Sequence, residues 1–317
     1  MPKPVILSLI GEDVMRPKMR EGLSELGELR FAAADALDAH PELCREAQIL
    51  VGAHNMQVRK PLLEKLPALR MCADYGVGFD GYELSEFVRR GIKLSHTPDV
   101  LSKDVADFGF ALLLTLTRRT AQADKFVRDG RWPKEGFPLG TRIFGKKAGI
   151  AGLGRIGRVI AQRCAAFDME VGYTARHAKD VPYRRFESLE AMAALCDVLF
   201  VVIPGSPETT HLVNREVLEA LGPKGILVNI ARGALVDTEA LIACLEEKKL
   251  GGAALDVFEH EPFVEEKLLG FENVVLAPHI ASGTIETRDD MADMLVRNVK
   301  CFLEGRPLEN PVPGTEG

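Results

Sequence analysis

The sequence predicts an α/β protein with doubly wound parallel sheets, and three observations support this fold class. Short apolar runs typical of strands alternate with helix-like segments over most of the 317 residues. One such run ends in the glycine pattern GLGRIG at residues 152–157, and an amphipathic helix-like segment, 155–167, follows it. A second short strand, 170–173, comes next, so the glycine motif has the βαβ context that it requires.

The N-terminal third has the alternation expected of a parallel α/β domain. Its expected strands are Val5 to Ile10, Ile49 to Ala53, Leu69 to Ala73 and Ile92 to Ser95, and its expected helices include Met15 to Leu26 and Tyr82 to Arg90. After Pro98 the pattern changes to that of a long helix from Val100 to about Arg118. A proline near the start of this segment is typical of a helix N-terminus. The segment 130–140 contains several Gly and Pro residues and is expected to be a loop.

The rest of the chain predicts a doubly wound dinucleotide domain of six strands that begins at the glycine motif. These strands are Ala148 to Ala151, Glu170 to Tyr173, Val198 to Ile203, Ile226 to Ile230, Ala253 to Val257 and Val274 to Ala277. The final helix, 285–304, is expected to return to the first domain. We therefore expect two Rossmann-like/flavodoxin-like domains: a discontinuous substrate-binding domain at residues 1–97 and 285–317, and a dinucleotide-binding domain at 98–284.

The composition is that of an ordinary globular protein, with 46% hydrophobic and 27% charged residues. The net charge of −6 and the absence of a Lys/Arg block argue against a nucleic-acid or acidic-membrane partner. The N-terminal apolar run is too short for a membrane span and lacks a signal-type cleavage site, so we expect a cytoplasmic protein. The six cysteines have no CxxC spacing and are expected to be reduced and structural.

The glycine motif also indicates which dinucleotide binds. Its glycines permit a tight turn, a close approach of phosphate to the backbone, and close packing of helix on strand. An NAD site usually has an acid about 20 residues later that accepts hydrogen bonds from the ribose. This chain has Thr174 there, followed by Arg176, His177 and Lys179. A guanidinium can grip a 2′-phosphate, so NADPH is favoured over NADH, with NAD(H) still possible. The alternative is that these charges are ordinary solvated loop residues.

Three polar residues follow consecutive strands of the predicted dinucleotide domain, where ligands of open α/β sheets bind. They are Arg232, Glu261 and His279. Each alone has an ordinary structural explanation: a solvated cation, a turn acid before proline, and a hydrogen-bonded core histidine. Together they suit hydride transfer to a carbonyl, in which histidine supplies the proton, a carboxylate orients the imidazole and favours its charged form, and arginine binds the substrate.

Five motifs carry a resemblance that spans nearly the whole chain. YGVGFD (75–80), GLGRIG (152–157), NIARG (229–233), ALDVFEHEP (254–262) and APHIAS (277–282) resemble the D-isomer-specific 2-hydroxyacid dehydrogenase family. The resemblance implies that Arg232 binds the 2-oxoacid, that Glu261 pairs with the histidine, and that His279 is the acid/base. Glu259 is a rival acid nearby, but it does not hold the matching position.

The resemblance extends to binding residues. It implies that main-chain amides at Val77 and Gly78 bind the substrate carboxylate and that Asp256 contacts the nicotinamide. Simple turn and strand-end roles are the alternatives. The glycine motif, the basic residues after it and the resemblance together give the full set of expected cofactor contacts: Val105, Gly152, Leu153, Gly154, Arg155, Ile156, Gly157, Thr174, Arg176, His177, Lys179, Pro204, Thr209, Ile230, Asp256, His279 and Ser282. No His/Cys cluster indicates a metal, and none is expected.

Within that family, FPLG (137–140), AFD (166–168) and the Thr174/Arg176 pair look most like the NADPH-preferring glyoxylate and hydroxypyruvate reductases. A small 2-oxoacid is therefore the expected substrate. The alternatives are a D-lactate-type or other bulkier 2-hydroxyacid dehydrogenase and a nonenzymatic dinucleotide-sensing corepressor. The resemblance also implies a homodimer, and the arm around Trp132 is a candidate for part of the contact.

Overall fold

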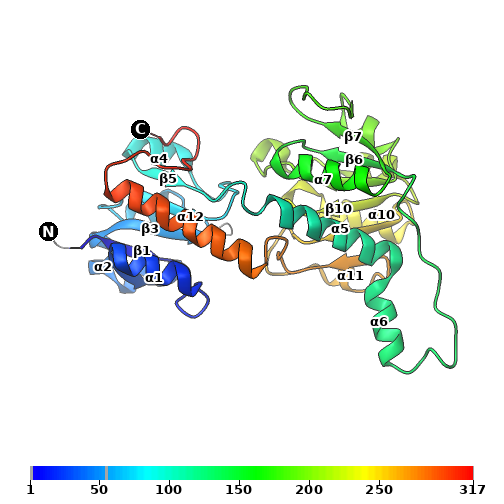
Figure 1. The fold of residues 1–317 in the computed structure, drawn as a ribbon, viewed down its shortest axis with the longest axis horizontal. Coiled ribbons are helices and arrows are strands. Elements are labelled where there is room, and N and C mark those ends of the chain that lie inside the picture. The colour runs from blue at the N-terminus through cyan, green and yellow to red at the C-terminus, as the bar shows by residue number, and fades with distance from the viewer. Residues whose placement is uncertain (1–2, 54–55, 317) are drawn as a thin grey trace. The chain divides into compact units, whose positions relative to one another are not determined.

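The computed structural model describes residues 3–53 and 56–316, and its chain divides into two compact units. The first unit contains the residues up to Leu101 together with those from Gly283 onward. The second unit runs from Ser102 to Ser282. Each unit is built around its own all-parallel sheet with helices on both faces, which confirms the predicted fold class (Figure 1).

The first unit has a five-stranded sheet in the order β2-β1-β3-β4-β5, which is the flavodoxin-like order. Its strands are β1 (Val5–Ser8), β2 (Glu28–Phe31), β3 (Ala47–Ala53), β4 (Met71–Tyr75) and β5 (Lys93–Ser95). Its helices are α1 (Pro17–Leu26), η1 (Ala34–Ala39), α2 (Pro41–Glu46), α3 (Lys60–Glu64), α4 (Leu84–Arg90) and α12 (Ile285–Leu303).

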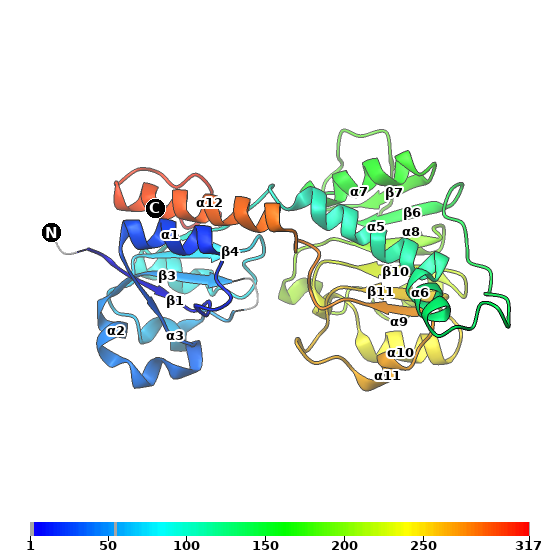
Figure 2. The ribbon, with the colours of Figure 1, turned by 60° about the horizontal axis from the view of Figure 1, so that its bottom comes forward.

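Helix α12 returns from the C-terminal part of the chain to complete the first unit. It lies beside α1 and over β4, whereas α2 and α3 lie on the opposite face of the sheet (Figure 2). Met291, Leu295 and Val299 recur every fourth residue and are buried, so they form one apolar face of this helix. The Tyr75 hydroxyl also donates a hydrogen bond to the Arg288 carbonyl at 2.6 Å.

The second unit has a seven-stranded sheet in the order β12-β11-β10-β9-β6-β7-β8. Its strands are β6 (Lys147–Ala151), β7 (Glu170–Thr174), β8 (Arg184–Arg185), β9 (Val198–Val201), β10 (Ile226–Asn229), β11 (Gly252–Leu255) and β12 (Val274–Leu276). Its helices are α5 (Ser102–Arg118), α6 (Thr120–Arg128), α7 (Arg155–Ala166), α8 (Leu189–Ala193), η2 (Pro207–Thr209), α9 (Arg215–Leu221), η3 (Gly233–Leu235), α10 (Thr238–Glu246) and α11 (Glu266–Leu269).

Two helix layers cover this second sheet. Helices α5 and α7 pack on one face, and α8, α9 and α10 lie together on the other (Figure 2). The Phe110 ring of α5 stacks on Phe200 of β9 with the ring centroids 5.5 Å apart. Helix α6 and the loop after it extend away from the sheet (Figure 1). No helix in the described part of the chain is both long enough and apolar enough to span a membrane.

The observed elements correct several sequence predictions. The second sheet has seven strands rather than six, because the two-residue strand β8 pairs with β7. The edge strand β2 and helix α6 were not predicted. The expected strand over 253–257 ends at Leu255, so Asp256 follows the strand instead of lying in it. The helices expected to begin at Met15, Tyr82 and Val100 each begin two residues later.

Candidate active site and cofactor site

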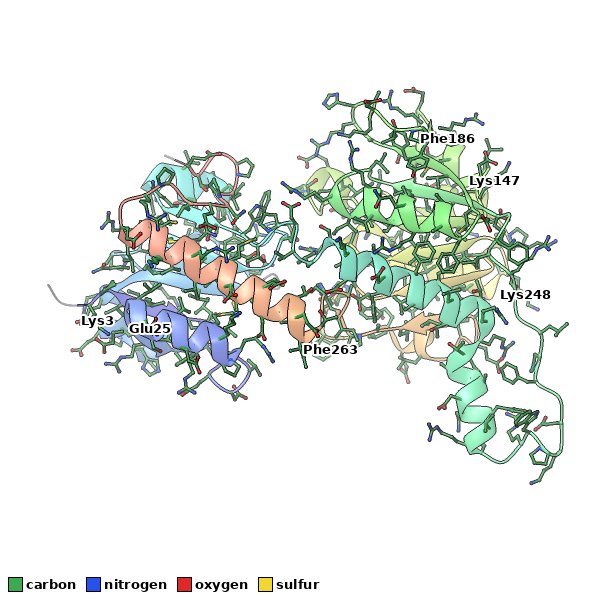
Figure 3. The ribbon with its side chains drawn as sticks, viewed as in Figure 1. Lys3, Glu25, Lys147, Phe186, Lys248 and Phe263 are labelled. Carbon is green, nitrogen blue, oxygen red and sulfur yellow. The ribbon has the colours of Figure 1, made fainter. Side chains whose placement is uncertain are left out.

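Arg232, Glu261 and His279 lie in the loops that follow β10, β11 and β12, which are neighbours in the second sheet. Because these strands are parallel, their carboxyl ends meet at one edge of the sheet. Figure 3 shows Phe263, two residues after Glu261, at the opposite end of the strands from Lys147, the first residue of β6.

The structure pairs His279 with Glu261. The imidazole Nδ1 lies 2.7 Å from Glu261 Oε2, and the Phe258 backbone N–H donates a 3.0 Å hydrogen bond to Glu261 Oε1. Both carboxylate oxygens are therefore engaged. An ionised carboxylate only accepts, so Nδ1 carries a proton and Nε2 becomes the ring atom suited to proton exchange. The two side chains are 25% and 26% exposed, so a substrate can reach them.

Asp256 shapes the turn that presents His279. Its side chain is fully buried, and its two oxygens accept hydrogen bonds from the backbone N–H groups of Ile280 and Ala281, each at 2.8 Å. Its carbonyl accepts a 2.8 Å bond from the His279 N–H. His279 itself has a left-handed φ of 54°. Burial raises the pKa of Asp256, although these amide bonds oppose the shift.

Glu259, the rival acid, has a different partner. Its Oε1 lies 2.6 Å from His211 Nε2, in the segment after η2. Burial alone would raise the pKa of Glu259, but hydrogen bonds from His211 and Thr238 and the charge of His211 lower it overall. The same bond is the largest cause of the raised pKa of His211. Sequence reasoning missed His211, because nothing in the local pattern links it to residue 259.

Arg232 lies in a turn that Asn229 fixes. Asn229 Oδ1 accepts a 3.1 Å bond from the Ala231 N–H, and its Nδ2 donates to the Arg232 carbonyl at 2.9 Å. The next residue is Gly233, where a Cβ would lie 1.9 Å from the Phe258 carbonyl carbon. Only glycine allows this contact, which packs the loop after β10 against the loop that carries Glu261.

The three glycines of the 152–157 motif have three different environments. Gly152 has a φ of 99°, and a Cβ on Gly157 would lie 2.0 Å from the Gly152 carbonyl oxygen. These two positions therefore serve the turn and the close packing of α7 on β6. Gly154, the N-cap of α7, would place a Cβ in open space. It is the position at which a phosphate can approach bare backbone.

Thr174 is the last residue of β7, and the basic residues follow in an irregular loop. Arg176 and His177 are exposed, whereas Lys179 is half-buried and donates its backbone N–H to the Tyr173 hydroxyl at 2.9 Å. A hydrogen bond from Ser206 is the main reason for the lowered pKa of Glu208 in η2, and the charge of Arg176 contributes. The predicted cofactor contact Thr209 is the last residue of η2, and Pro204 lies shortly before this element.

The remaining predicted contacts fall into two groups. The side chains of Val105, Leu153 and Ile230 are buried in the second unit. Arg155, Ile156, Pro204, Thr209 and Ser282 are at least partly exposed. Val77 and Gly78 belong to the loop after β4 in the first unit and are partly exposed. Among the described residues, no group of three or more His, Cys, Asp or Glu side chains is placed to hold a metal ion.

The glycine turn, together with the His279–Glu261 pair at the strand ends, is the arrangement expected of a dinucleotide-dependent oxidoreductase. Comparison with known proteins gives its family: residues 110–281 match the model of the D-isomer specific 2-hydroxyacid dehydrogenase, NAD binding domain. The chain belongs to the D-isomer-specific 2-hydroxyacid dehydrogenase family, as its motifs predicted.

Three similar proteins illustrate the relationship. Hydroxyphenylpyruvate reductase from Plectranthus scutellarioides is 47% identical over 264 residues, which cover 83% of this chain and 84% of that protein. The 2-ketogluconate reductase from Gluconobacter oxydans is 39% identical over 311 residues, which cover 98% of this chain and 99% of that protein. The crystal structure of an NADPH-dependent glyoxylate/hydroxypyruvate reductase from Sinorhizobium meliloti, with NADP and malonate, has a TM-score of 0.94 at 39% identity and covers 99% of this chain and 98% of that one.

Proposed function

We propose that this protein reduces a small 2-oxoacid, glyoxylate or hydroxypyruvate, to the 2-hydroxy acid with NADPH. The observation that carries the proposal is the 2.7 Å pairing of His279 Nδ1 with Glu261 Oε2 at the strand ends of a dinucleotide fold. The pairing supplies an oriented acid at the edge of the sheet where ligands of such folds bind. The similarity to the Sinorhizobium meliloti reductase supports the choice of substrate and cofactor.

The chemistry divides between the cofactor and the side chains. NADPH, when bound, supplies the hydride that the substrate carbonyl carbon receives. Protonated His279 gives its Nε2 proton to the carbonyl oxygen, which becomes the hydroxyl group, and the neutral imidazole then takes a proton from solvent. Glu261 holds the ring and stabilises its charged form. Arg232 binds the 2-oxoacid, and the main-chain amides of Val77 and Gly78 receive its carboxylate.

The cofactor proposal assigns the pyrophosphate to the glycine turn and the 2′-phosphate to the loop after β7. The N-terminal amides of α7 and the open space at Gly154 suit a phosphate. Thr174 offers no carboxylate to repel a 2′-phosphate, and Arg176 is exposed beside it. Asp256 stays assigned to the nicotinamide region, where its buried carboxylate shapes the turn of His279.

Initial rates with NADPH and with NADH test the function. The substrates are glyoxylate, hydroxypyruvate, pyruvate, phenylpyruvate, hydroxyphenylpyruvate and 2-ketogluconate. We expect the highest kcat/KM with NADPH and one of the first two acids. Turnover of none of the acids would favour the dinucleotide-sensing alternative. A preference for hydroxyphenylpyruvate would favour the bulkier-substrate alternative, which the 47% identity to a hydroxyphenylpyruvate reductase supports.

We also propose that two copies of the chain associate through the arm after α6. Trp132 is 69% exposed and Leu139 is 96% exposed, so two large apolar side chains of one arm face solvent in the single chain. A second copy would cover them. Trp132→Ser with Leu139→Ser should shift the protein from dimer to monomer in sedimentation velocity, whereas Val14→Ser, at a residue that is 69% exposed in the first unit, should leave the dimer intact. A wild-type monomer would contradict the proposal.

A further inference from the structure

The loop after β4, residues 76–80, is held by the residues that follow the neighbouring strand β5. The Thr97 backbone N–H and hydroxyl both donate to the Gly76 carbonyl, at 2.7 and 3.0 Å. His96 Nδ1 lies 3.0 Å from the Val77 carbonyl oxygen. Two successive carbonyls of this loop, those of Gly76 and Val77, are thus bonded by two consecutive residues.

The imidazole of His96 is fixed in this arrangement. A carbonyl oxygen can only accept, so Nδ1 carries the proton of this bond. His96 is 8% exposed and Thr97 is fully buried. The imidazole and the Phe79 ring form a T-shaped contact with the centroids 5.7 Å apart, and the backbone N–H of His96 donates to the Asn310 carbonyl at 3.1 Å. The donors therefore have little freedom to move.

The hydrogen bonds of His96 and Thr97 to these two carbonyls have a consequence for the opposite side of the loop. In a trans peptide the C=O and the N–H point in opposite directions. The peptide that carries the Gly76 carbonyl also carries the Val77 N–H, and the next peptide joins the Val77 carbonyl to the Gly78 N–H. Fixing both carbonyls toward His96 and Thr97 directs both N–H groups away from them. Two successive amides with one direction form a site for an anion.

We infer that His96 and Thr97 are positioning residues for substrate binding: they orient the Val77 and Gly78 amides to receive the carboxylate of the 2-oxoacid. This inference rests on the proposed function. It makes binding of the carboxylate depend on one ring nitrogen of a buried histidine that neither donates a proton to the substrate nor touches it. The cost of losing that bond should fall on substrate affinity rather than on the chemical step.

Two substitutions of His96 separate this role from simple packing. In His96→Asn the side-chain amide occupies the place of Nδ1 and can donate to the Val77 carbonyl. In His96→Gln the amide occupies the place of Nε2 and cannot. We expect His96→Gln to raise KM for glyoxylate roughly 3- to 10-fold, as for a lost neutral hydrogen bond, with kcat and the KM for NADPH nearly unchanged. His96→Asn should restore KM to within about 2-fold of the wild type.

A second readout and controls complete the experiment. The dissociation constant of oxalate, measured by calorimetry with NADPH present, should follow the same order of variants. Thr97→Val, which removes the hydroxyl but keeps the backbone donor, should weaken oxalate binding by a smaller factor. His40→Gln, at an exposed histidine of the first unit, controls for the substitution itself. Circular dichroism and the Tm establish that each variant is folded, and Thr97→Val serves if His96→Gln is not.

The outcomes distinguish the inference from the function on which it rests. If the wild type reduces glyoxylate and binds oxalate but Asn and Gln at position 96 behave alike, the inference is wrong and the proposed function stands. A fall in kcat at constant KM would also overturn it. If the wild type neither reduces a 2-oxoacid nor binds oxalate, the proposed function and the inference both fail.

Discussion

The two units of this protein use one sheet architecture in two ways. In each, the first strand lies inside the sheet, β1 between β2 and β3, and β6 between β7 and β9. The loop after β6 is a glycine turn with open space at Gly154. The corresponding loop after β1 is filled: Leu9 and Ile10 are only 7% and 8% exposed, and Ser8 Oγ bonds to the backbone of Ile10.

This difference shows how the fold permits binding without requiring it at any one loop. Where side chains fill the first turn, as at Leu9 and Ile10, the bare glycine backbone that suits a phosphate is missing, and the proposed function uses the amides of the loop after β4 in the first unit instead. Where glycines leave the first turn bare, a dinucleotide can bind and the later strand ends are available for chemistry.

The largest effect should come from His279, if the strand ends of the second unit carry the chemistry. His279→Ala removes the proton donor and should lower kcat roughly 100- to 10,000-fold, the range typical of a positioned general acid. The dissociation constant of NADPH, measured by fluorescence titration, should stay nearly unchanged. Equal loss of cofactor binding and turnover would instead make His279 a structural residue of the cofactor site.

Glu261→Gln is the companion variant. It retains the shape of the carboxylate that lies 2.7 Å from His279 but removes the charge that stabilises the protonated ring. kcat/KM for the 2-oxoacid should therefore fall, while the dissociation constant of NADPH stays nearly unchanged. Wild-type behaviour of both variants would contradict the assignment of this pair.

The second prediction concerns the choice between NADPH and NADH, because the residues proposed to select the cofactor belong to the second unit. Arg176→Ala should raise KM for NADPH roughly 10- to 150-fold, the equivalent of about 1.5 to 3 kcal/mol for a lost charge-assisted contact. KM for NADH should hardly change. Adding Thr174→Asp should then favour NADH, since the new carboxylate accepts ribose hydroxyls and repels phosphate. Arg45→Ala, at an exposed cation of the first unit, is the control. Equal weakening of both cofactors would return Arg176 to the class of solvated charges.

The glycine turn itself provides the third prediction. Gly157→Ala places a Cβ 2.0 Å from the Gly152 carbonyl oxygen, so the backbone must shift. We expect a loss of about 1 to 3 kcal/mol in the free energy of unfolding, as for overpacked cores. Gly154→Ala has no atom within 4 Å of its new Cβ, so its unfolding curve without cofactor should match the wild type while NADPH binding weakens. Similar unfolding curves for both variants would contradict the assigned division of roles.

The sequence predicted the features that depend on local pattern. The glycine motif, the strand alternation and the three strand-end residues are all readable along the chain, and the pairing of His279 with Glu261 was implied by the family motif. Features fixed by distant contacts were not readable. The strand β8 consists of two arginines, and β2 is an edge strand with charged residues, so neither has the apolar run that signals a strand.

The same limit applies to the candidate site. Glu259 and His211 are 48 residues apart and pair only because two loops meet. His96 contacts a carbonyl 19 residues earlier, and a backbone acceptor leaves no trace in the sequence. Asp256 was expected in a strand, yet it follows β11, and its carboxylate accepts the amides of the turn after β12. Such partners are specified by tertiary packing and not by the spacing of residue types.

The smallest expected effect concerns the pairing of His211, in the segment after η2, with Glu259, in the loop that also carries Glu261. The pKa of His211 is raised in the folded protein. The stability that His211 contributes is therefore fully present below its pKa in the unfolded chain, about 6.5, and is lost as the pH rises through its higher pKa in the folded protein. The lowered pKa of Glu259 has the opposite sign: its contribution is lost as the pH falls below about 4. The charged pair should therefore stabilise most near pH 5 to 6.

His211→Gln keeps a donor near the place of Nε2 but never carries the charge, so comparison with the wild type isolates the ionic part of this pair. Because the His211 side chain is 43% exposed, solvent screening should limit the difference in unfolding free energy to under about 1 kcal/mol. Thermal unfolding should show the wild type more stable at about pH 5.5 and the two proteins equal at about pH 9. Turnover should change little, since His211 pairs with Glu259, whereas His279 pairs with Glu261. A stability difference that is independent of pH would mean that His211 acts by packing alone, and a large loss of turnover would place this loop contact in the catalytic apparatus of the second unit.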